Sequence, residues 1–234
     1  MTQAGTTILA AAVVAAGYLS ALCATPPNPP LDQKDRHTTD RISFMTGSVA
    51  TVIRRIVVTA IMYHALLTVL PTYAPDRMAQ MCPHLQNLNP ALFTWSTTTA
   101  GALLMIFTGA FVRLAAYRGL SQNFTFHLAA PSQLVTTGIY KWMQHPSYTG
   151  MALISLGATA LFMRWDGAPG CWTREATISQ LNGWGLSIAA GTSTLGLMML
   201  FTRVKDEEEM LKQKFGKQWD KWHQSTKRFI PGIL

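Results

Sequence analysis

Charged residues are scarce in this sequence of 234 residues: 13% are Asp, Glu, Lys or Arg, whereas 49% are hydrophobic and the mean hydropathy is +0.17. Soluble globular domains usually carry about 25% charged residues. The shortage indicates a lipid environment, where charges are costly and are confined to connecting segments. The net charge is +8, but the basic residues lie between apolar segments. We therefore expect anionic lipid headgroups, and no nucleic acid, as their partners.

Cysteine is also scarce, since the chain has only Cys23, Cys82 and Cys171. No two of them form a Cys-x-x-Cys pair, which argues against zinc binding. We expect no metal site. The sequence also lacks internal repeats, and its main compositional bias is the short proline cluster at residues 26–30.

Five apolar segments are predicted to cross a membrane as helices, for which about 20 residues are needed. The first could also be a secretory signal, but no Lys or Arg precedes it, which favours a retained span. The predicted fold class is therefore an all-α integral membrane protein with about five transmembrane helices and a cytosolic, helical C-terminal segment. The five predicted spans are residues 6–24, 56–73, 91–112, 151–163 and 183–201.

The basic residues are distributed unequally between the two sides of the membrane. Of the 19 Lys and Arg, all but Arg77, Arg164 and Arg174 lie on the side of the C-terminus if the number of spans is odd. The positive-inside rule then places the C-terminal segment in the cytosol and the N-terminus on the opposite side. Cys82 and Cys171 both lie on that opposite, lumenal side, where a disulfide can form.

Two features within the spans have a structural and a functional interpretation. His64 lies in the middle of the second span, and an intramembrane histidine can be functional. We favour the alternative, a packed residue bonded to a neighbouring helix. In the fifth span, Gly191 and Gly196 belong to a set of small residues that are expected to let helices approach closely.

The C-terminal segment, residues 203–234, is predicted to be a helix that continues directly from the fifth span, with a break at Gly216. We interpret the acidic run at residues 206–209 as largely a solvated face. Glu207 is the exception, because it lies four residues after Arg203, on the same helix face and at the membrane boundary. An apolar stripe at helical spacing comprises Leu211, Phe215, Trp219 and Trp222.

Residues 138–150 hold the densest set of specialised side chains. Proline is favoured at the first position of a helix and disfavours helical conformation in the residue before it, so His145 is predicted to be the N-cap of the fourth span. The backbone N–H groups of Ser147, Tyr148 and Thr149 would then be free. Such a helix N-terminus can bind an anion, for example a carboxylate.

Two motifs in this half of the chain resemble those of the isoprenylcysteine carboxyl methyltransferase family. The first consists of Gly138, Tyr140, Gln144, His145, Pro146, Tyr148 and Gly150, and Leu134, Val135 and Thr136 precede it. The second consists of Arg203, Val204, Glu207, Glu208, Leu211, Phe215, Gly216, Trp219, Trp222, Arg228, Phe229, Ile230 and Pro231. We expect two parts: transmembrane helices in residues 1–122, and a methyltransferase core with two further spans in residues 123–234.

The resemblance implies an enzyme of the endoplasmic reticulum membrane that transfers a methyl group from S-adenosylmethionine to the C-terminal carboxylate of prenylated cysteine in proteins. Arg203 would be the catalytic and substrate-binding residue. The carboxylate has a pKa near 3.5, so it is already an ionised nucleophile at pH 7 and needs orientation but no general base. The residues that would bind the cofactor are Ser132, Gln133, Leu134, Val135, Tyr140, His145, Pro146, Ser147, Tyr148 and Glu207.

One position departs from the family pattern, which usually has Arg before the His-Pro pair. This chain has Gln144 there, which keeps hydrogen bonding but lacks the charge. Alternatives are therefore a divergent relative acting on another lipophilic carboxylate, or a structural membrane protein without activity. A phospholipid N-methyltransferase is a further alternative, although its amine substrate would not favour a neighbouring Arg203. A sterol reductase would resemble this chain only in the C-terminal region.

Overall fold

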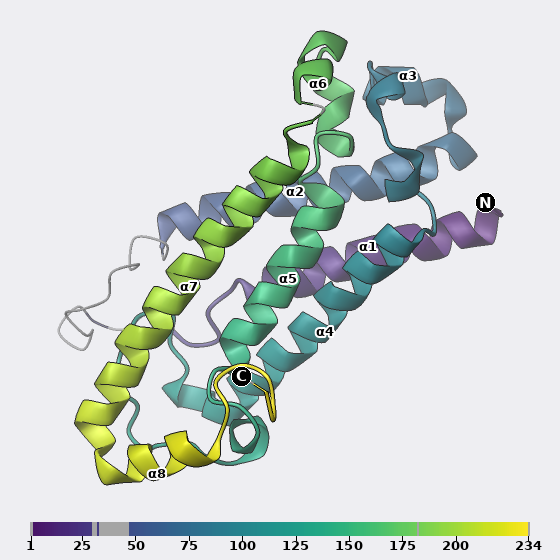
Figure 1. The fold of residues 1–234 in the computed structure, drawn as a ribbon. Coiled ribbons are helices and arrows are strands. Elements are labelled where there is room, and N and C mark those ends of the chain that lie inside the picture. The colour runs from purple at the N-terminus through teal and green to yellow at the C-terminus, as the bar shows by residue number, and fades with distance from the viewer. Residues whose placement is uncertain (1, 30–31, 33–46, 182, 234) are drawn as a thin grey trace. The chain divides into compact units, whose positions relative to one another are not determined.

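The computed structural model describes residues 2–29, 32, 47–181 and 183–233. All regular elements in these ranges are helical and none is a strand, which confirms the predicted all-α fold (Figure 1). The predicted polar linker with Lys34, Arg36 and Arg41 lies outside the described residues.

The five predicted spans all form helices, and each helix extends beyond one of its two predicted ends. The α-helices are α1 (Gln3–Cys23), α2 (Ser48–Tyr73), α3 (Met78–Met81), α4 (Thr97–Leu120), α5 (Pro146–Phe162), α6 (Glu175–Leu181), α7 (Gly185–Phe215) and α8 (Lys217–Ser225). Short 3-10 helices occur at η3 (Pro75–Arg77), η4 (Leu85–Asn87), η5 (Pro90–Leu92), η6 (Ser121–Asn123), η7 (Gly138–Lys141) and η8 (Ala168–Trp172).

Three helical segments within the described ranges are long and apolar enough to cross a membrane: α1, α2 and the segment Pro90–Asn123 that contains α4. α5 has only 17 residues, fewer than the roughly 20 that a bilayer requires, and α7 is also outside this set. The count of five spans is therefore not confirmed. All three candidate spans carry exposed apolar side chains, as expected of helices that face lipid, including Ile8, Tyr18, Ile56, Met62, Leu104 and Phe111.

The chain divides into two compact units, each assembled from separate segments. Unit 1 comprises Met1–Leu22, Ile53–Thr108 and Leu153–Ser193, and unit 2 comprises Cys23–Val52, Gly109–Ala152 and Thr194–Leu234. The expected division between residues 122 and 123 concerns which segment carries the chemistry, and it stays a prediction.

Unit 1 has an apolar core in which His64 is fully buried. Its Nε2 lies 3.0 Å from the carbonyl oxygen of Leu92, and its ring stacks on Phe93 at 4.4 Å between centroids. The edge of the ring also meets Phe162. These contacts confirm the interpretation of His64 as a packed, hydrogen-bonded residue. The core is built around Leu9, Val13, Ala16, Ile61, Ala65, Leu92, Ala102, Leu103, Ile106, Leu161 and Phe162.

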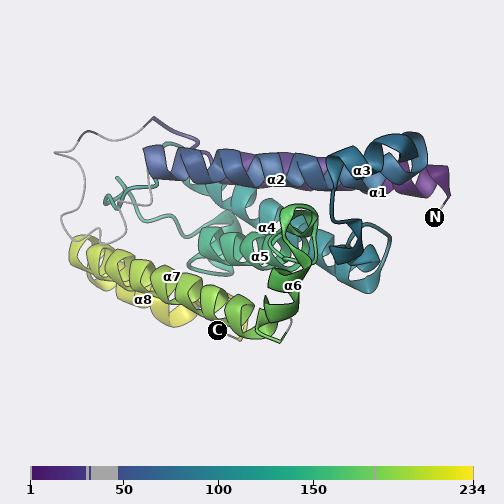
Figure 2. The same cartoon turned by 90° about the horizontal axis from the view of Figure 1, so that it is seen from above.

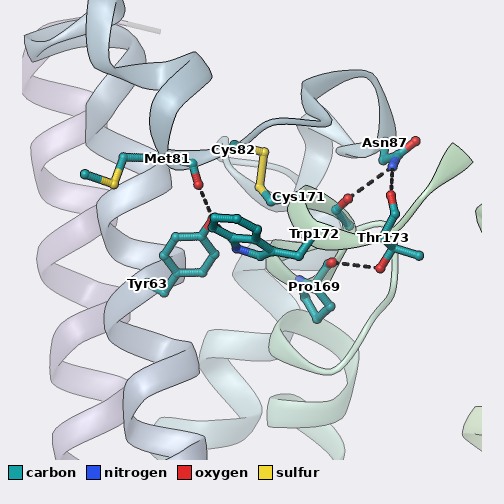
Figure 3. Close-up of a disulfide and its surroundings, with 9 residues drawn as sticks. Tyr63, Met81, Cys82, Asn87, Pro169, Cys171, Trp172 and Thr173 are labelled. Carbon is teal, nitrogen blue, oxygen red and sulfur yellow. Dashed lines mark hydrogen bonds between the residues drawn. A yellow bond between two sulfur atoms is a disulfide. The ribbon is translucent and has the colours of Figure 1, made fainter.

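A disulfide joins Cys82 and Cys171 in unit 1 and confirms the expected pairing (Figure 3). Hydrogen bonds brace the segments on both sides of it. Asn87 donates to the carbonyl oxygens of Gly170 and Thr173 at 3.1 and 2.7 Å. The bond closes a loop of 89 residues, so it greatly restricts the unfolded chain.

Unit 2 contains the bend between α7 and α8, which both views show as a sharp turn (Figure 1 and Figure 2). α7 ends at Phe215, and Gly216 has φ +50°, a left-handed conformation that favours glycine. The predicted break at Gly216 is therefore confirmed. So is the apolar stripe: Leu211, Trp219 and Trp222 are buried in a cluster with Ala116, Leu128, Tyr140 and Met210, and Phe215 packs against it.

Of the glycines in the fifth predicted span, Gly185 does allow a close approach, since a Cβ there would lie 2.0 Å from the ring of Trp165, but Gly191 and Gly196 do not have the role expected of them. A side chain at Gly191 or Gly196 would meet no heavy atom within 4 Å in the part of the chain that the structure describes. In unit 2 the close helix approach is instead at Gly150 on α5. A Cβ there would lie 2.5 Å from the carbonyl oxygen of Gly109 and 2.8 Å from Cβ of Arg113, both on α4.

Candidate functional site

The first motif folds around the start of α5 in unit 2. α5 begins at Pro146, as predicted from the His-Pro pair. The carbonyl oxygen of His145 accepts bonds from the N–H groups of Tyr148 and Thr149, both at 3.1 Å. The prediction that these two N–H groups are free is therefore wrong, because the first helical turn uses them internally.

The second motif begins on α7, where Arg203 and Glu207 are four residues apart. The hydroxyl of Tyr148 donates to Oε2 of Glu207 at 2.8 Å and accepts from Nε of Arg203 at 3.3 Å. Arg203 is 5% exposed, and its Nη2 also donates to the carbonyl oxygen of Phe126 at 3.0 Å. One phenol thus joins the two motifs to form a single polar network.

A second polar network surrounds His145, which is 3% exposed. Its Nε2 lies 3.2 Å from Oε1 of Glu208, and Arg228 donates to both oxygens of the same carboxylate at 2.7 and 2.8 Å. Burial raises the pKa of the Glu208 carboxyl, but the bonds from His145 and Arg228 outweigh it and hold the pKa at about 2. Glu208 is therefore ionised throughout the physiological range.

The side-chain amide of Gln144 forms its hydrogen bonds with other residues of the protein. Its amide nitrogen donates to the carbonyl oxygens of His223 and Thr226 at 3.1 and 2.5 Å, and its oxygen lies 2.8 Å from Nδ1 of His223. The side chain is buried, so its satisfied amide stabilises the contact between residues 143–145 and the C-terminal segment. The departure from the family pattern at this position is therefore accommodated by that segment.

Eight of the ten predicted cofactor-binding residues fall into two groups. Leu134, Val135 and Tyr140 pack in or against the apolar cluster, and the hydroxyl of Tyr140 donates to the carbonyl oxygen of Ala116 at 3.4 Å. Burial and the charge of Glu207 raise the pKa of Tyr140, so this phenol stays neutral. The polar group comprises His145, Ser147, Tyr148 and Glu207, together with the buried Pro146.

Ser132 and Gln133 lie apart from both groups as far as the described contacts show. Both residues are exposed. The backbone N–H and the hydroxyl of Ser132 donate to Oδ1 of Asn123 at 3.1 and 3.0 Å, which fixes the loop at this point. Their proposed role toward a cofactor therefore rests on the motif alone.

Sequence reasoning missed Arg113, which it counted as a basic residue at the end of a span. Arg113 is 5% exposed; Nε donates to the carbonyl oxygen of Cys23 at 2.8 Å. Nη1 donates to the carbonyl oxygen and the hydroxyl of Ser147 at 3.0 and 2.7 Å. The guanidinium also lies over the rings of Tyr117 and Phe126. The feature of the sequence that could have identified Arg113 is its charge inside an otherwise apolar helix.

Glu208 and Arg228 belong to the second motif, but no role in the site was predicted for either of them. The interpretation of residues 206–209 as a solvated face is wrong for Asp206 and Glu208, which are 5% and 9% exposed. The available signal was spacing: Glu208 precedes Leu211 by three residues and so extends the buried stripe of the helix. Apart from its place in the motif, Arg228 gave no comparable signal, because its partner lies 20 residues away on another element.

The site matches the functional groups of the cofactor that the sequence leads us to expect. Glu207 can accept hydrogen bonds from the cofactor's ammonium or ribose hydroxyls, whereas Arg203 can bind the carboxylate of the expected substrate. Nδ1 of His145 is buried without a hydrogen-bond partner in the described structure, so it too can accept. The apolar cluster beside Tyr140 suits an aromatic base. Within the described residues, no group of three or more His, Cys, Asp or Glu forms a metal site.

Comparison of the chain with known proteins supports the same family resemblance as the two motifs. Residues 102–167 match the model of the isoprenylcysteine carboxyl methyltransferase family. Over 150 residues the chain is 32% identical to a protein-S-isoprenylcysteine O-methyltransferase of Dictyostelium discoideum, which covers 62% of this chain and 53% of that protein. Over 144 residues it is 24% identical to a probable protein-S-isoprenylcysteine O-methyltransferase of Oryza sativa subsp. indica, covering 59% and 63% respectively. The chain thus spans about half to two thirds of these relatives, and the resemblance is confirmed.

Proposed function

We propose that this chain, which resembles the isoprenylcysteine carboxyl methyltransferases in both of its motifs, methylates the C-terminal carboxylate of prenylated cysteine in proteins. S-adenosylmethionine, when bound, would supply an activated methyl group. The observation that carries the proposal is the bridge from Tyr148 to Arg203 and Glu207. It joins a residue suited to hold an anionic substrate to one suited to hold the cofactor.

Arg203 is the substrate residue in this proposal. Its guanidinium binds the carboxylate of the substrate through charge-assisted hydrogen bonds. The carboxylate needs no general base, so the residues of the site act by orienting it in line with the methyl group. Burial of Arg203 strengthens its interaction with the carboxylate, because competing water is excluded.

The cofactor is proposed to bind through both groups of residues described above. Glu207 accepts hydrogen bonds from its ammonium or ribose hydroxyls, and Tyr148 holds Glu207 in place. Leu134, Val135 and Tyr140 contribute an apolar wall. The remaining proposed contacts are Ser132, Gln133, His145, Pro146 and Ser147.

The proposed setting is the endoplasmic reticulum membrane, with five spans and a cytosolic C-terminal segment. The disulfide between Cys82 and Cys171 supports this orientation, because disulfides persist in the lumen and not in the cytosol. The site residues lie in connections assigned to the other side. The prenyl chain of the substrate would be buried among apolar helices, at about 0.8 kcal/mol per CH₂ group.

The contacts of Gln144 weaken two of the alternatives: a divergent relative that acts on another lipophilic carboxylate, and a structural membrane protein without activity. The side chain of Gln144 is consumed by His223 and Thr226. A change at a buried contact of this kind bears on the packing of the C-terminal segment. It gives no reason to expect a different substrate or a loss of activity.

The test is a comparison of methyl acceptors in membranes that contain the chain. We expect labelled S-adenosylmethionine to label N-acetyl-S-farnesyl-cysteine, and not its carboxamide, which lacks the nucleophilic carboxylate. Phosphatidylethanolamine should not be labelled. Labelling of the carboxamide or of the amine lipid in preference to the acid would overturn the proposal and favour an N-methyltransferase.

A further inference from the structure

Arg228, near the C-terminus, forms a bidentate ion pair with the buried carboxylate of Glu208. Its Nε and Nη2 donate to the two oxygens of Glu208 at 2.7 and 2.8 Å. This parallel geometry is the strongest form of an arginine–carboxylate contact, and a lysine cannot reproduce it. The side chain of Glu208 is 11% exposed, so water competes little for its oxygens.

Glu208 in turn determines which nitrogen of His145 carries a proton. An ionised carboxylate only accepts hydrogen bonds, so Nε2 of His145 must donate across the 3.2 Å contact. In the neutral imidazole Nδ1 then carries the lone pair. Nδ1 is buried and has no partner among the described residues. A buried acceptor without a donor is costly, which indicates that a ligand provides one.

The backbone holds Arg228 at this position. The N–H groups of Gln144 and His145 donate to the carbonyl oxygens of Lys227 and Arg228 at 2.8 and 2.9 Å. Thr149 donates from its hydroxyl to the carbonyl oxygen of Phe229 at 3.0 Å. The C-terminal segment therefore lies along the start of α5, and it delivers the guanidinium to the carboxylate that contacts His145.

We propose that Arg228 and Glu208 are positioning residues that hold the imidazole of His145 so that Nδ1 accepts a hydrogen bond from an N–H or O–H group of the nucleoside cofactor. This inference rests on the proposed function and deepens it. The C-terminal segment is then part of the cofactor site, although only His145 touches the ligand.

The test is calorimetric titration of the full-length protein in nanodiscs with S-adenosylhomocysteine, which retains the donor groups and does not react. Arg228→Ala and Glu208→Gln should each weaken binding about tenfold, the usual effect of losing a hydrogen bond to a charged group. Arg228→Lys should fall between wild type and Arg228→Ala. The double variant should bind no more weakly than Glu208→Gln alone, because both changes break the same chain of contacts.

Two further variants separate positioning from loss of structure. His145→Gln keeps a donor toward Glu208 but has no acceptor in the position of Nδ1. It should weaken binding about tenfold while the amide hydrogens of residues 144 and 145 stay protected from exchange, which shows that the C-terminal segment remains in place. Lys227→Ala removes a neighbouring exposed charge and keeps the backbone pairing, so its affinity should equal that of the wild type.

The outcomes distinguish this proposal from the proposed function. Wild-type affinity in Glu208→Gln and in His145→Gln would overturn the positioning role and leave the methyltransferase assignment intact. The same weakening in Lys227→Ala as in Arg228→Ala would overturn it as well, because the effect would then be one of general charge. Failure of the wild-type protein to bind S-adenosylhomocysteine would overturn both.

Discussion

The hydroxyl of Tyr148, at the start of α5, donates a 2.8 Å hydrogen bond to the carboxylate of Glu207 on α7. The two residues are 59 positions apart in the chain. This contact brings together the two motifs that resemble one family, and it places a donor on the residue proposed to hold the cofactor. The same hydroxyl accepts from Arg203, so substrate and cofactor residues share one phenol.

Replacement of Tyr148 by Phe tests this shared role. The ring and its packing stay, while Glu207 and Arg203 both lose a hydrogen-bond partner. Losing a bond to a charged group costs about 1.5–3 kcal/mol, so we expect kcat/KM to fall by one to two orders of magnitude, with a higher KM for both substrates. Steady-state kinetics with each substrate varied in turn measure this. An effect on the KM for S-adenosylmethionine alone would show that Arg203 does not depend on Tyr148.

Arg113, on α4, is expected to stabilise the start of α5. Arg113→Ala removes a buried, charged donor from the carbonyl oxygens of Cys23 and Ser147 and from the hydroxyl of Ser147, while the Cys23 oxygen still accepts from the hydroxyl of Tyr117. We expect a loss of about 1.5–3 kcal/mol in the free energy of unfolding, the usual cost of losing hydrogen bonds to a charged group. Ser147→Ala removes only a hydroxyl and is the milder, matched variant. Thermal unfolding in detergent measures both; equal stability of Arg113→Ala and wild type would contradict this account.

The disulfide between Cys82 and Cys171 should be detectable by counting thiols. Denatured but unreduced protein should react with maleimide at one site, Cys23, and reduced protein at all three cysteines. We expect Cys82→Ser to lower the free energy of unfolding by about 2–5 kcal/mol, because the loop it opens is long. Three reactive thiols before reduction would contradict the pairing and remove its support for the orientation.

Glu208 makes stability depend on pH. Its pKa is about 2 in the folded protein, against 4.5 ordinarily, so its stabilising contribution is complete above pH 4.5 and is lost as the pH falls towards 2. This contribution is about 3 kcal/mol, at 1.4 kcal/mol per pKa unit. The groups that face it are His145, Arg228 and, at longer range, His223. Thermal unfolding of wild type and Glu208→Gln between pH 6 and 3 tests this: the difference between them should shrink at low pH, and a constant difference would contradict it.

Local signals were enough to predict much of the fold. Apolar segments gave the helices, Gly216 gave the break between α7 and α8, and the spacing of Leu211, Trp219 and Trp222 gave their buried face. Two isolated cysteines on one predicted side gave the disulfide. Each of these follows from periodicity, turn chemistry or composition within a short stretch.

The polar contacts of the site could not be predicted in the same way. Arg228, Glu208 and His145 meet only because the C-terminal segment pairs with residues 144–145, about 80 positions earlier. A run of charges such as residues 206–209 gives no direct sign of which members find partners. The motifs identified Arg203 and Glu207. Of the residues that hold these two side chains in place, the motifs identified only Tyr148.

The most direct test of the central claim is the chemical nature of the bond formed. The purified protein, labelled S-adenosylmethionine and N-acetyl-S-farnesyl-cysteine are incubated together, and the product is treated with alkali. The account predicts that the label is released as volatile methanol, as from a methyl ester, and that Arg203→Ala reduces this yield at least tenfold. Label that resists alkali, or a yield unchanged by Arg203→Ala, would contradict carboxylate methylation at this site.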